Sequence, residues 1–385
     1  MTAQPYITGT GLYVPPFGIT NEELVTSYNA YADLQNIEHA EAIAAGTQVA
    51  WTHSSAAFIE KVSGIKHRYV VEKTGVLDPT RMYPKLTPRA DNEMSLAAEA
   101  CVAAANDALA VAQLTGADID AVICGSANFA RAYPALAIEV QQALGAGGFA
   151  FDMNVACSSA TFSLGQAVGQ IAAGLAQRVL VLTPEITSGH LEWRDRDCHF
   201  IFGDAVTAVI VESATAAAQS SAAKPDTPRK LAAWRILGTD MQTQFTNNIR
   251  NNAGYMSSAE DRDPNARDQR FYQNGRAVFK EVCPMAAAHI SGHLAKLGFE
   301  PTNARRYWLH QANAGMNALI AKKLLGREAT ADDAPIILDE FANTAAAGSI
   351  IAFHKHNADL KVGDVGVICS FGAGYSIGSV VVERV

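Results

Sequence analysis

The sequence predicts an α/β protein built from two related βα halves, and three observations support this prediction. Apolar, strand-like runs alternate with small-residue helical stretches between residues 93 and 185, a pattern typical of α/β layers. Residues 303–313 resemble 117–128, and 371–383 resemble 202–212, as expected for a duplicated unit. The chain has 385 residues, of which 49% are hydrophobic and 29 are glycine, so it is long enough for a large layered core.

The expected elements follow the hydrophobic pattern along the chain. A strand is predicted at residues 6–13, helical periodicity follows at 21–62, and three prolines (Pro79, Pro84 and Pro88) then predict a loop. The rest of the first half should contain an Ala-rich helix at 93–113, a buried strand at 119–124, a helix near 134–144, a strand at 149–155, a small-residue helix at about 157–174 and a strand at 179–185.

We divide the chain into two halves and a connection. Residues 1–212 form the predicted N-terminal half, and residues 233–385 form the C-terminal half. Residues 213–232 are rich in Ala, Ser, Thr, Pro and Lys, which indicates a linker between the halves.

Charge and cysteine usage exclude several classes of protein. A formal net charge of −8 argues against a global nucleic-acid footprint. The six cysteines form no CxxC pair, so neither a metal site nor a redox dithiol is indicated. The sequence shows no basic leader and no apolar run of the roughly 20 residues that a membrane span needs. A soluble, cytoplasmic protein is expected.

Cys157 is the first candidate for chemistry. In residues 155–174 a strand ends, Cys157 follows, and a helix of small residues begins at once. The N-terminus of a helix favours a thiolate, which can accept an acyl group from a thioester. The alternative is that this cysteine only packs or caps the helix. Packing is the expected role of the other five cysteines.

Three further segments in the C-terminal half carry candidate residues. His310 ends the apolar run YWLH, at the kind of strand end where α/β proteins gather their sites. Asn343 precedes a helix of small residues, and the segment 370–379 is a Gly-rich turn between two strands. Each has a plain structural alternative: a buried histidine, a helix N-cap and a simple hairpin.

Together, these four segments resemble β-ketoacyl-acyl-carrier-protein (ACP) synthase III enzymes, in which they occur in the same order. Residues 272–282 resemble the family's Asn-Gly-Arg-x-Val-Phe segment, and 202–205 its Phe-Gly-Asp turn. The resemblance runs from about residue 90 to the end and is weaker before that, where SGIKHR at 63–68 carries it. It implies the thiolase fold, in which two duplicated βα halves form layers in the order α-β-α-β-α.

The resemblance also implies a site and a reaction. Cys157, His310 and Asn343 would form a catalytic triad, with the backbone N–H groups of Cys157 and Ala373 stabilising an oxyanion in the Gly372–Gly374 loop. The reaction would be a decarboxylating Claisen condensation of an acyl-CoA primer with malonyl-ACP in fatty-acid biosynthesis. It would need no metal or redox cofactor.

Partners follow from the same resemblance. Lys322, Lys323 and Arg327 lie on the helix after His310 and would attract the acidic ACP, although an ordinary solvated helix face explains them equally well. The family has an arginine where this chain has Gly315, so the docking surface is expected to differ.

For CoA, the resemblance implies contacts with Phe58, Lys66 and Asn313. Val62 stands where the family has an arginine, which removes a cation from the adenine site. A homodimer is implied as well, with Tyr133 reaching across to the partner's acyl pocket and residues 147–155 forming the strand at the interface.

Residues 30–60 and 72–92 are longer than the family norm, which predicts a primer longer than acetyl.

Two alternative functions stay open. One is a synthase III-like acyltransferase of specialised metabolism, and the other is a non-catalytic partner that only binds the carrier protein. A non-decarboxylating thiolase would need a second cysteine in the Gly-rich turn, and SFGAGYSIG has none.

Overall fold

The computed structural model describes residues 4–385 apart from 222–228, 230 and 264. Its main sheet has nine strands in the order β11-β12-β13-β8-β1-β7-β6-β4-β5. The strands span β1 Tyr6–Tyr13, β4 Ala121–Gly125, β5 Phe149–Met153, β6 Arg178–Glu185, β7 Ala205–Glu212, β8 Trp234–Thr243, β11 Ala304–Leu309, β12 Val365–Gly372 and β13 Ser376–Arg384. Four short strands form two small sheets, β2 Phe17–Thr20 with β3 His67–Val70 and β9 Ile249–Arg250 with β10 Tyr272–Gln273.

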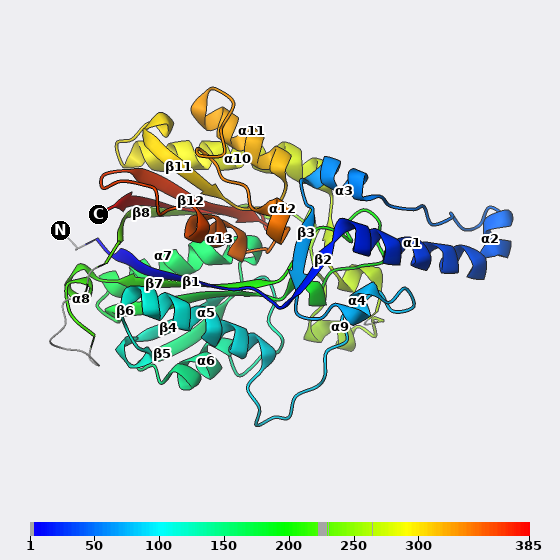
Figure 1. Cartoon of the computed structure of the whole chain (residues 1–385), viewed down its shortest axis with the longest axis horizontal. Helices are drawn as coiled ribbons and strands as arrows, with labels where there is room; N and C mark the ends of the chain where they lie inside the picture. Colours follow the sequence, from blue (N-terminus) through cyan, green and yellow to red (C-terminus); the bar gives the residue numbers. More distant parts are fainter. Residues whose placement is uncertain (1–3, 222–228, 230, 264) are drawn as a thin grey trace.

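The helices surround and separate the two parts of this sheet (Figure 1). They are α1 Asn21–Glu38, α2 Ala40–Ala44, α3 Ala56–Ser63, α4 Thr74–Leu77, α5 Leu96–Ala112, α6 Leu136–Leu144, α7 Ser159–Ala172, α8 Ala214–Ala217, α9 Tyr255–Ala259, α10 Gly275–Lys296, α11 Ala314–Leu325, α12 Leu338–Phe341 and α13 Ala347–Lys355.

The sheet divides naturally between β1 and β8, which pair through only two residues of each strand, Tyr6 with Arg235 and Ile7 with Trp234. Helices α7 and α13 pack against strands of both parts, whereas α5 and α6 cover one outer face and α10 and α11 cover the other. The layers therefore run α-β-α-β-α, as the resemblance implied.

Small side chains let the central helix α7 approach both sheets closely. A Cβ on Gly378 of β13 would lie 2.4 Å from Thr161 Oγ1, and one on Gly125 of β4 would lie 2.2 Å from Ser163 Oγ. Such distances leave room only for glycine. This tight central layer fixes the start of α7, and with it Cys157, relative to both halves.

The predicted elements of the first half agree with the structure to within a few residues. The Ala-rich helix is α5, which begins after Ser95, whose side chain accepts a hydrogen bond from the Ala98 N–H. The helix expected from residue 157 begins at Ser159, because Ala156–Ser158 form a separate 3-10 turn. The helical stretch at 21–62 breaks into three helices, α1, α2 and α3.

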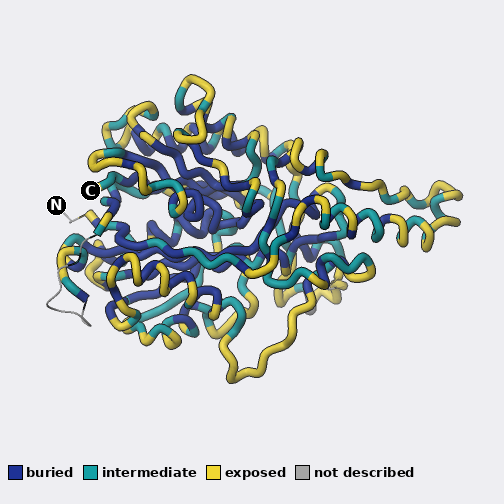
Figure 2. Tube along the Cα trace, in the orientation of Figure 1, coloured by how far each residue is buried: buried dark blue, intermediate teal, exposed yellow. Residues whose placement is uncertain are grey.

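Helices α1 and α2 form an arm that projects from the body (Figures 1 and 2). Helix α1 is anchored in the core as far as Ala32, through residues such as Leu24 and Tyr28, and α2 buries none of its residues. The segment that returns along α1 is fastened by hydrogen bonds between Asn36 and the Trp51 backbone at 2.9 Å in both directions.

The predicted linker at 213–232 falls between β7 and β8. Its described part contains the short helix α8, while residues 222–228 and 230 lie outside the described residues. The division of the chain into two domains at this point stays a prediction.

Among the described residues, none of the helices combines the length and apolar character needed to cross a bilayer.

Candidate active site

Cys157 lies at a tight junction between β5 and α7. The preceding residue, Ala156, has a φ of 47°, a left-handed conformation that is costly for alanine and is held only by its surroundings. The next residue, Ser158, donates a hydrogen bond from Oγ to the Ser376 carbonyl at 2.9 Å. The cysteine is thus fixed between the two halves, with its side chain partly accessible.

His310 follows directly after β11. Its backbone N–H donates to the Cys369 carbonyl at 2.8 Å, and its ring packs edge-on against Phe371 with 5.2 Å between centroids. Its Nδ1 is buried and makes no hydrogen bond of ordinary geometry among the described residues. Nε2 is therefore the ring nitrogen available to the cavity.

Asn343 is held at both its backbone and its side chain. Its N–H donates to the Ile201 carbonyl at 3.0 Å, and its carbonyl accepts from the Gly203 N–H at 3.1 Å. Its Oδ1 accepts from the Ala345 N–H at 2.9 Å. Because the oxygen is engaged there, the amide nitrogen is left to serve as a hydrogen-bond donor.

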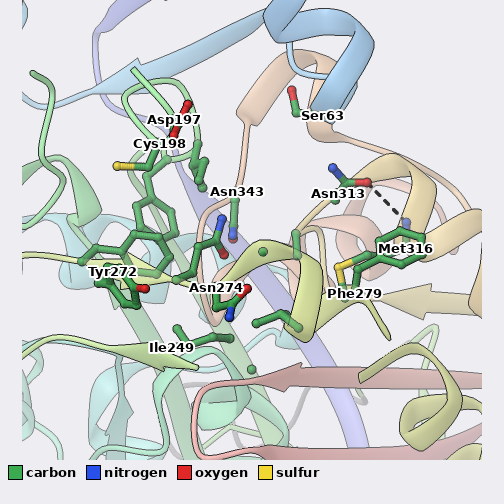
Figure 3. A pocket seen from close by; sticks show the side chains of 18 of the residues that line it. Ser63, Asp197, Cys198, Ile249, Tyr272, Asn274, Phe279, Asn313, Met316 and Asn343 are labelled. Atoms are coloured by element: carbon green, nitrogen blue, oxygen red, sulfur yellow. Dashed lines mark hydrogen bonds between the residues drawn. The ribbon is translucent and has the colours of Figure 1, made fainter. Parts of the chain in front are cut away.

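Cys157, His310 and Asn343 all line one cavity of about 840 Å³, a size that suits a small-molecule site. Figure 3 shows Asn343 between two groups of lining side chains, with Ile249 and Tyr272 on one side and Asn313 on the other. The structure therefore brings the three predicted residues together from three separate parts of the chain.

The site is desolvated, and this sets the resting protonation states. Burial, with Glu185 as a smaller cause, raises the pKa of Cys157 to about 12. Burial lowers the pKa of His310 to about 4, and the backbone of Ala345 opposes that shift. The resting pair is a neutral thiol and a neutral imidazole. The backbone N–H at the helix start does lower the pKa of Cys157, as expected, but desolvation outweighs this effect.

The Gly-rich turn lies directly against the cysteine. Gly372 ends β12, and a Cβ added to it would lie only 2.6 Å from the Cys157 Cβ. Ala373 is the next residue, and its carbonyl accepts a hydrogen bond from Ser376 Oγ at 2.9 Å. Gly374 follows with a φ of 130°, a conformation that glycine readily adopts.

The predicted CoA contacts divide into two groups. Phe58 and Asn313 line the cavity, and Asn313 also donates to the Val62 carbonyl at 2.6 Å, which joins α3 to α11. Lys66 is not among the residues lining this cavity and instead forms an ion pair with Glu60 at 3.2 Å.

A cation does lie beside Phe58, but it does not come from the position of Val62. The Arg196 guanidinium lies over the Phe58 ring, 4.5 Å from its centroid, a favourable cation–π geometry. Arg196 comes from the loop before β7, far from Phe58 in the sequence. Local spacing therefore gave no signal for this pair.

Two of the three predicted docking cations are already engaged in ion pairs. Lys322 pairs with Glu328, and Arg327 pairs with Asp333 at 2.7 Å. Arg276, at the start of α10, is instead exposed and lines the cavity. Lys280 is exposed one turn further along the same helix. Neither residue was among the predicted docking cations.

Tyr133 is 85% exposed and is absent from the residues that line the cavity. Strand β5, which contains most of the predicted interface segment, is one of the two edge strands of the main sheet, and β11 is the other. In the part of the chain that the structure describes, no group of three or more His, Cys, Asp or Glu side chains could hold a metal ion.

Comparisons with known proteins decide the family. Residues 151–225 match the family model for 3-oxoacyl-ACP synthase III, and residues 294–384 match the model for its C-terminal region. The β-ketodecanoyl-ACP synthase of Pseudomonas aeruginosa is 52% identical over 358 residues, which cover 93% of this chain and 99% of that protein. The chain belongs to the β-ketoacyl-ACP synthase III family. This synthase III is a condensing acyltransferase of fatty-acid synthesis.

More distant relatives support the same family and fold. The β-ketoacyl-ACP synthase III of Mesorhizobium japonicum is 31% identical over 284 residues, covering 73% of this synthase III and 82% of the relative. Among solved structures, the 3-oxoacyl-ACP synthase III of Aquifex aeolicus has a TM-score of 0.73 at 23% identity, covering 98% and 99% of the two chains. The priming β-ketosynthase of the R1128 polyketide pathway has a TM-score of 0.75 at 20% identity, covering 100% and 97%. The predicted layered α/β fold is confirmed.

Proposed function

We propose that this enzyme condenses octanoyl-CoA with malonyl-ACP to give β-ketodecanoyl-ACP, CoA and CO2. The observation that carries the proposal is the single cavity lined by Cys157, His310 and Asn343. The primer length comes from the 52% identical relative, whose name specifies a β-ketodecanoyl product. A malonyl extender contributes two carbons to that ten-carbon chain, so the primer supplies eight.

In the first half-reaction, Cys157 takes the acyl group. Its Sγ attacks the thioester carbonyl of the primer, a new C–S bond forms, and the thiol proton ends on the departing CoA sulfur. The backbone N–H groups of Cys157 and Ala373 would stabilise the oxyanion. The close contact between Gly372 and Cys157 supports this role for the loop.

In the second half-reaction, malonyl-ACP loses CO2. Asn343 and the Nε2–H of His310 would donate hydrogen bonds to the malonyl thioester carbonyl and so stabilise the enolate. The low pKa of His310, about 4, keeps its ring neutral while it acts as a donor. The carbanion then attacks the acyl-cysteine, a C–C bond forms, and Cys157 leaves as a thiolate that takes up a proton from solvent to restore the thiol.

An apolar section of the cavity wall suits a medium-length acyl chain. Phe202, Ile249, Phe271 and Phe371 all contribute to it. The Arg196 guanidinium is stacked on the Phe58 ring and would offer its other face to the CoA adenine. This arrangement replaces the arginine that the family has at the position of Val62.

The carrier protein would dock beside α10. Carrier proteins are acidic, and the exposed Arg276 and Lys280 would attract one to the cavity. We also propose a cytoplasmic homodimer in which β5 pairs with its partner copy and Tyr133 reaches across to the partner's acyl pocket. The edge position of β5 and the 85% exposure of Tyr133 support this arrangement.

A primer competition tests the proposed function. The enzyme is given malonyl-ACP and an equimolar mixture of acyl-CoAs from acetyl to dodecanoyl, and the acyl-ACP products are identified by mass spectrometry. β-Ketodecanoyl-ACP should dominate, and Cys157→Ala should form no product. A preference for acetyl-CoA would reject the chain-length assignment, and condensation by Cys157→Ala would reject the mechanism.

A further inference from the structure

Glu185 is a buried carboxyl group that the mechanism above does not use. It ends β6 and is only 1% exposed. Its Oε1 accepts two backbone hydrogen bonds, from the Ala127 N–H at 2.9 Å and from the Ala346 N–H at 3.2 Å. Its Oε2 lies 3.3 Å from Ser126 Oγ. One oxygen atom thus joins a loop of the N-terminal half to a turn of the C-terminal half.

The turn that Glu185 holds is the one that carries Asn343. Ala342 and Ala345 have φ values of 56° and 44°, which are strained for alanine and need support from their surroundings. The Ala345 N–H is bound by Asn343 Oδ1, and the next N–H along the chain, that of Ala346, is bound by Glu185. The orientation of the Asn343 amide therefore depends on a turn that Glu185 fastens.

Glu185 also acts electrostatically on the nucleophile. Burial raises the pKa of Glu185 to about 8, while the N–H groups of Ala127 and Ala346 oppose this shift and the charge of Asp204 adds to it. Glu185 in turn raises the pKa of Cys157. Glu185 is therefore mostly neutral at pH 7 and becomes negative as the pH rises through 8, and from there it increasingly opposes ionisation of the Cys157 thiol.

We propose that Glu185 is a positioning residue whose carboxyl group clamps the Asn343 turn against the 126–127 loop, next to Cys157. This inference rests on the proposed function, in which Cys157 takes the acyl group in the first half-reaction and Asn343 stabilises the enolate in the second. Glu185 touches neither substrate in this account. It acts through the two backbone N–H groups and through its charge.

The first test separates the two half-reactions. Glu185→Gln keeps an oxygen where Oε1 accepts both N–H bonds, so acylation and malonyl-ACP decarboxylation should both persist. Glu185→Ala removes the acceptor and frees the turn. Decarboxylation should then fall by about tenfold or more, while acylation of Cys157 by octanoyl-CoA falls much less. Glu139→Gln is the matched control, because Glu139 also accepts a backbone N–H, from Ser95 at 2.6 Å, but lies on the outer helix α6.

The second test uses Glu185→Gln and a readout that packing alone would not move. The rate of Cys157 alkylation by iodoacetamide is measured from about pH 6 to pH 10. Near pH 6 the variant and the wild type should react equally, because Glu185 is then protonated and neutral like glutamine. As the pH rises through about 8, the variant should become progressively faster.

The outcomes separate this inference from the proposed function. If Asn343→Ala keeps full decarboxylation, the proposed role of Asn343 fails whatever Glu185 does. If Asn343→Ala loses decarboxylation but Glu185→Ala loses both half-reactions equally, the positioning role is rejected. A ratio of alkylation rates that does not change with pH would reject the electrostatic role.

Discussion

Replacing Gly372 with alanine should disable the acylation step without unfolding the protein. The new Cβ would lie 2.6 Å from the Cys157 Cβ and 3.2 Å from its Sγ, where ordinary van der Waals contact begins at 3.4 Å. The two Cβ atoms must therefore separate by about 0.8 Å. A shift of about 1 Å at a reacting atom can cost about 100-fold in rate, and overpacking costs about 1–3 kcal/mol of stability.

The assay is single-turnover transfer of the acyl group from octanoyl-CoA to Cys157, followed by intact mass, together with thermal unfolding of the same samples. Gly169→Ala is the matched control. It lies on α7, the helix that follows Cys157, and a Cβ there meets nothing within 4 Å, so acylation should stay normal. If Gly372→Ala acylates at the wild-type rate, the contact between the Gly-rich loop and the nucleophile does not restrain the cysteine as we have argued.

Three further predictions concern the cavity and its surroundings. Arg196→Ala should raise KM for octanoyl-CoA but not for an octanoyl thioester that lacks adenine, since the guanidinium lies over Phe58. Reversing the charges of Arg276 and Lys280 to glutamate should raise KM for malonyl-ACP more than KM for malonyl-CoA, which has no carrier protein to dock. Arg327→Glu should have the smaller effect because Arg327 is already paired. The pKa of His310 is about 4, so its ring should stay neutral from pH 7 down to about pH 5, and the rate of malonyl decarboxylation should not fall through its protonation in that range. A pH–rate profile with such a fall near pH 6.5 would show that burial does not lower the pKa of His310.

The fold and the three central residues could be predicted because their signals are local in sequence. The start of α7 after Cys157, the strand before His310 and the turn at Asn343 each lie within a short run whose pattern is visible without the rest of the chain. The repeat of the βα unit predicted which distant segments of the chain lie close together. A repeated βα unit places equivalent strand ends together, and the structure brings all three side chains to one cavity.

The residues that were missed depend on contacts between distant segments. Arg196 reaches Phe58 only because the loop before β7 folds back over α3. In the sequence, Glu185 is simply the last residue of a predicted strand. The raised pKa of Cys157 could not be predicted from the sequence, since its desolvation is a property of the assembled cavity. The three cations were visible in the sequence, although Arg327 lies just beyond α11 and not on it as predicted. The acidic partners Glu328 and Asp333 follow in a loop whose path the sequence did not reveal.

The most direct test of the account follows the mass of the intact protein through one catalytic cycle. Wild-type enzyme mixed with octanoyl-CoA should gain one octanoyl group, and the Cys157→Ala variant should gain none. Malonyl-ACP added next should remove that group, with release of CO2 and appearance of β-ketodecanoyl-ACP. An octanoyl group attached to the Cys157→Ala variant, or a Cys157 adduct that malonyl-ACP cannot discharge, would contradict the central claim.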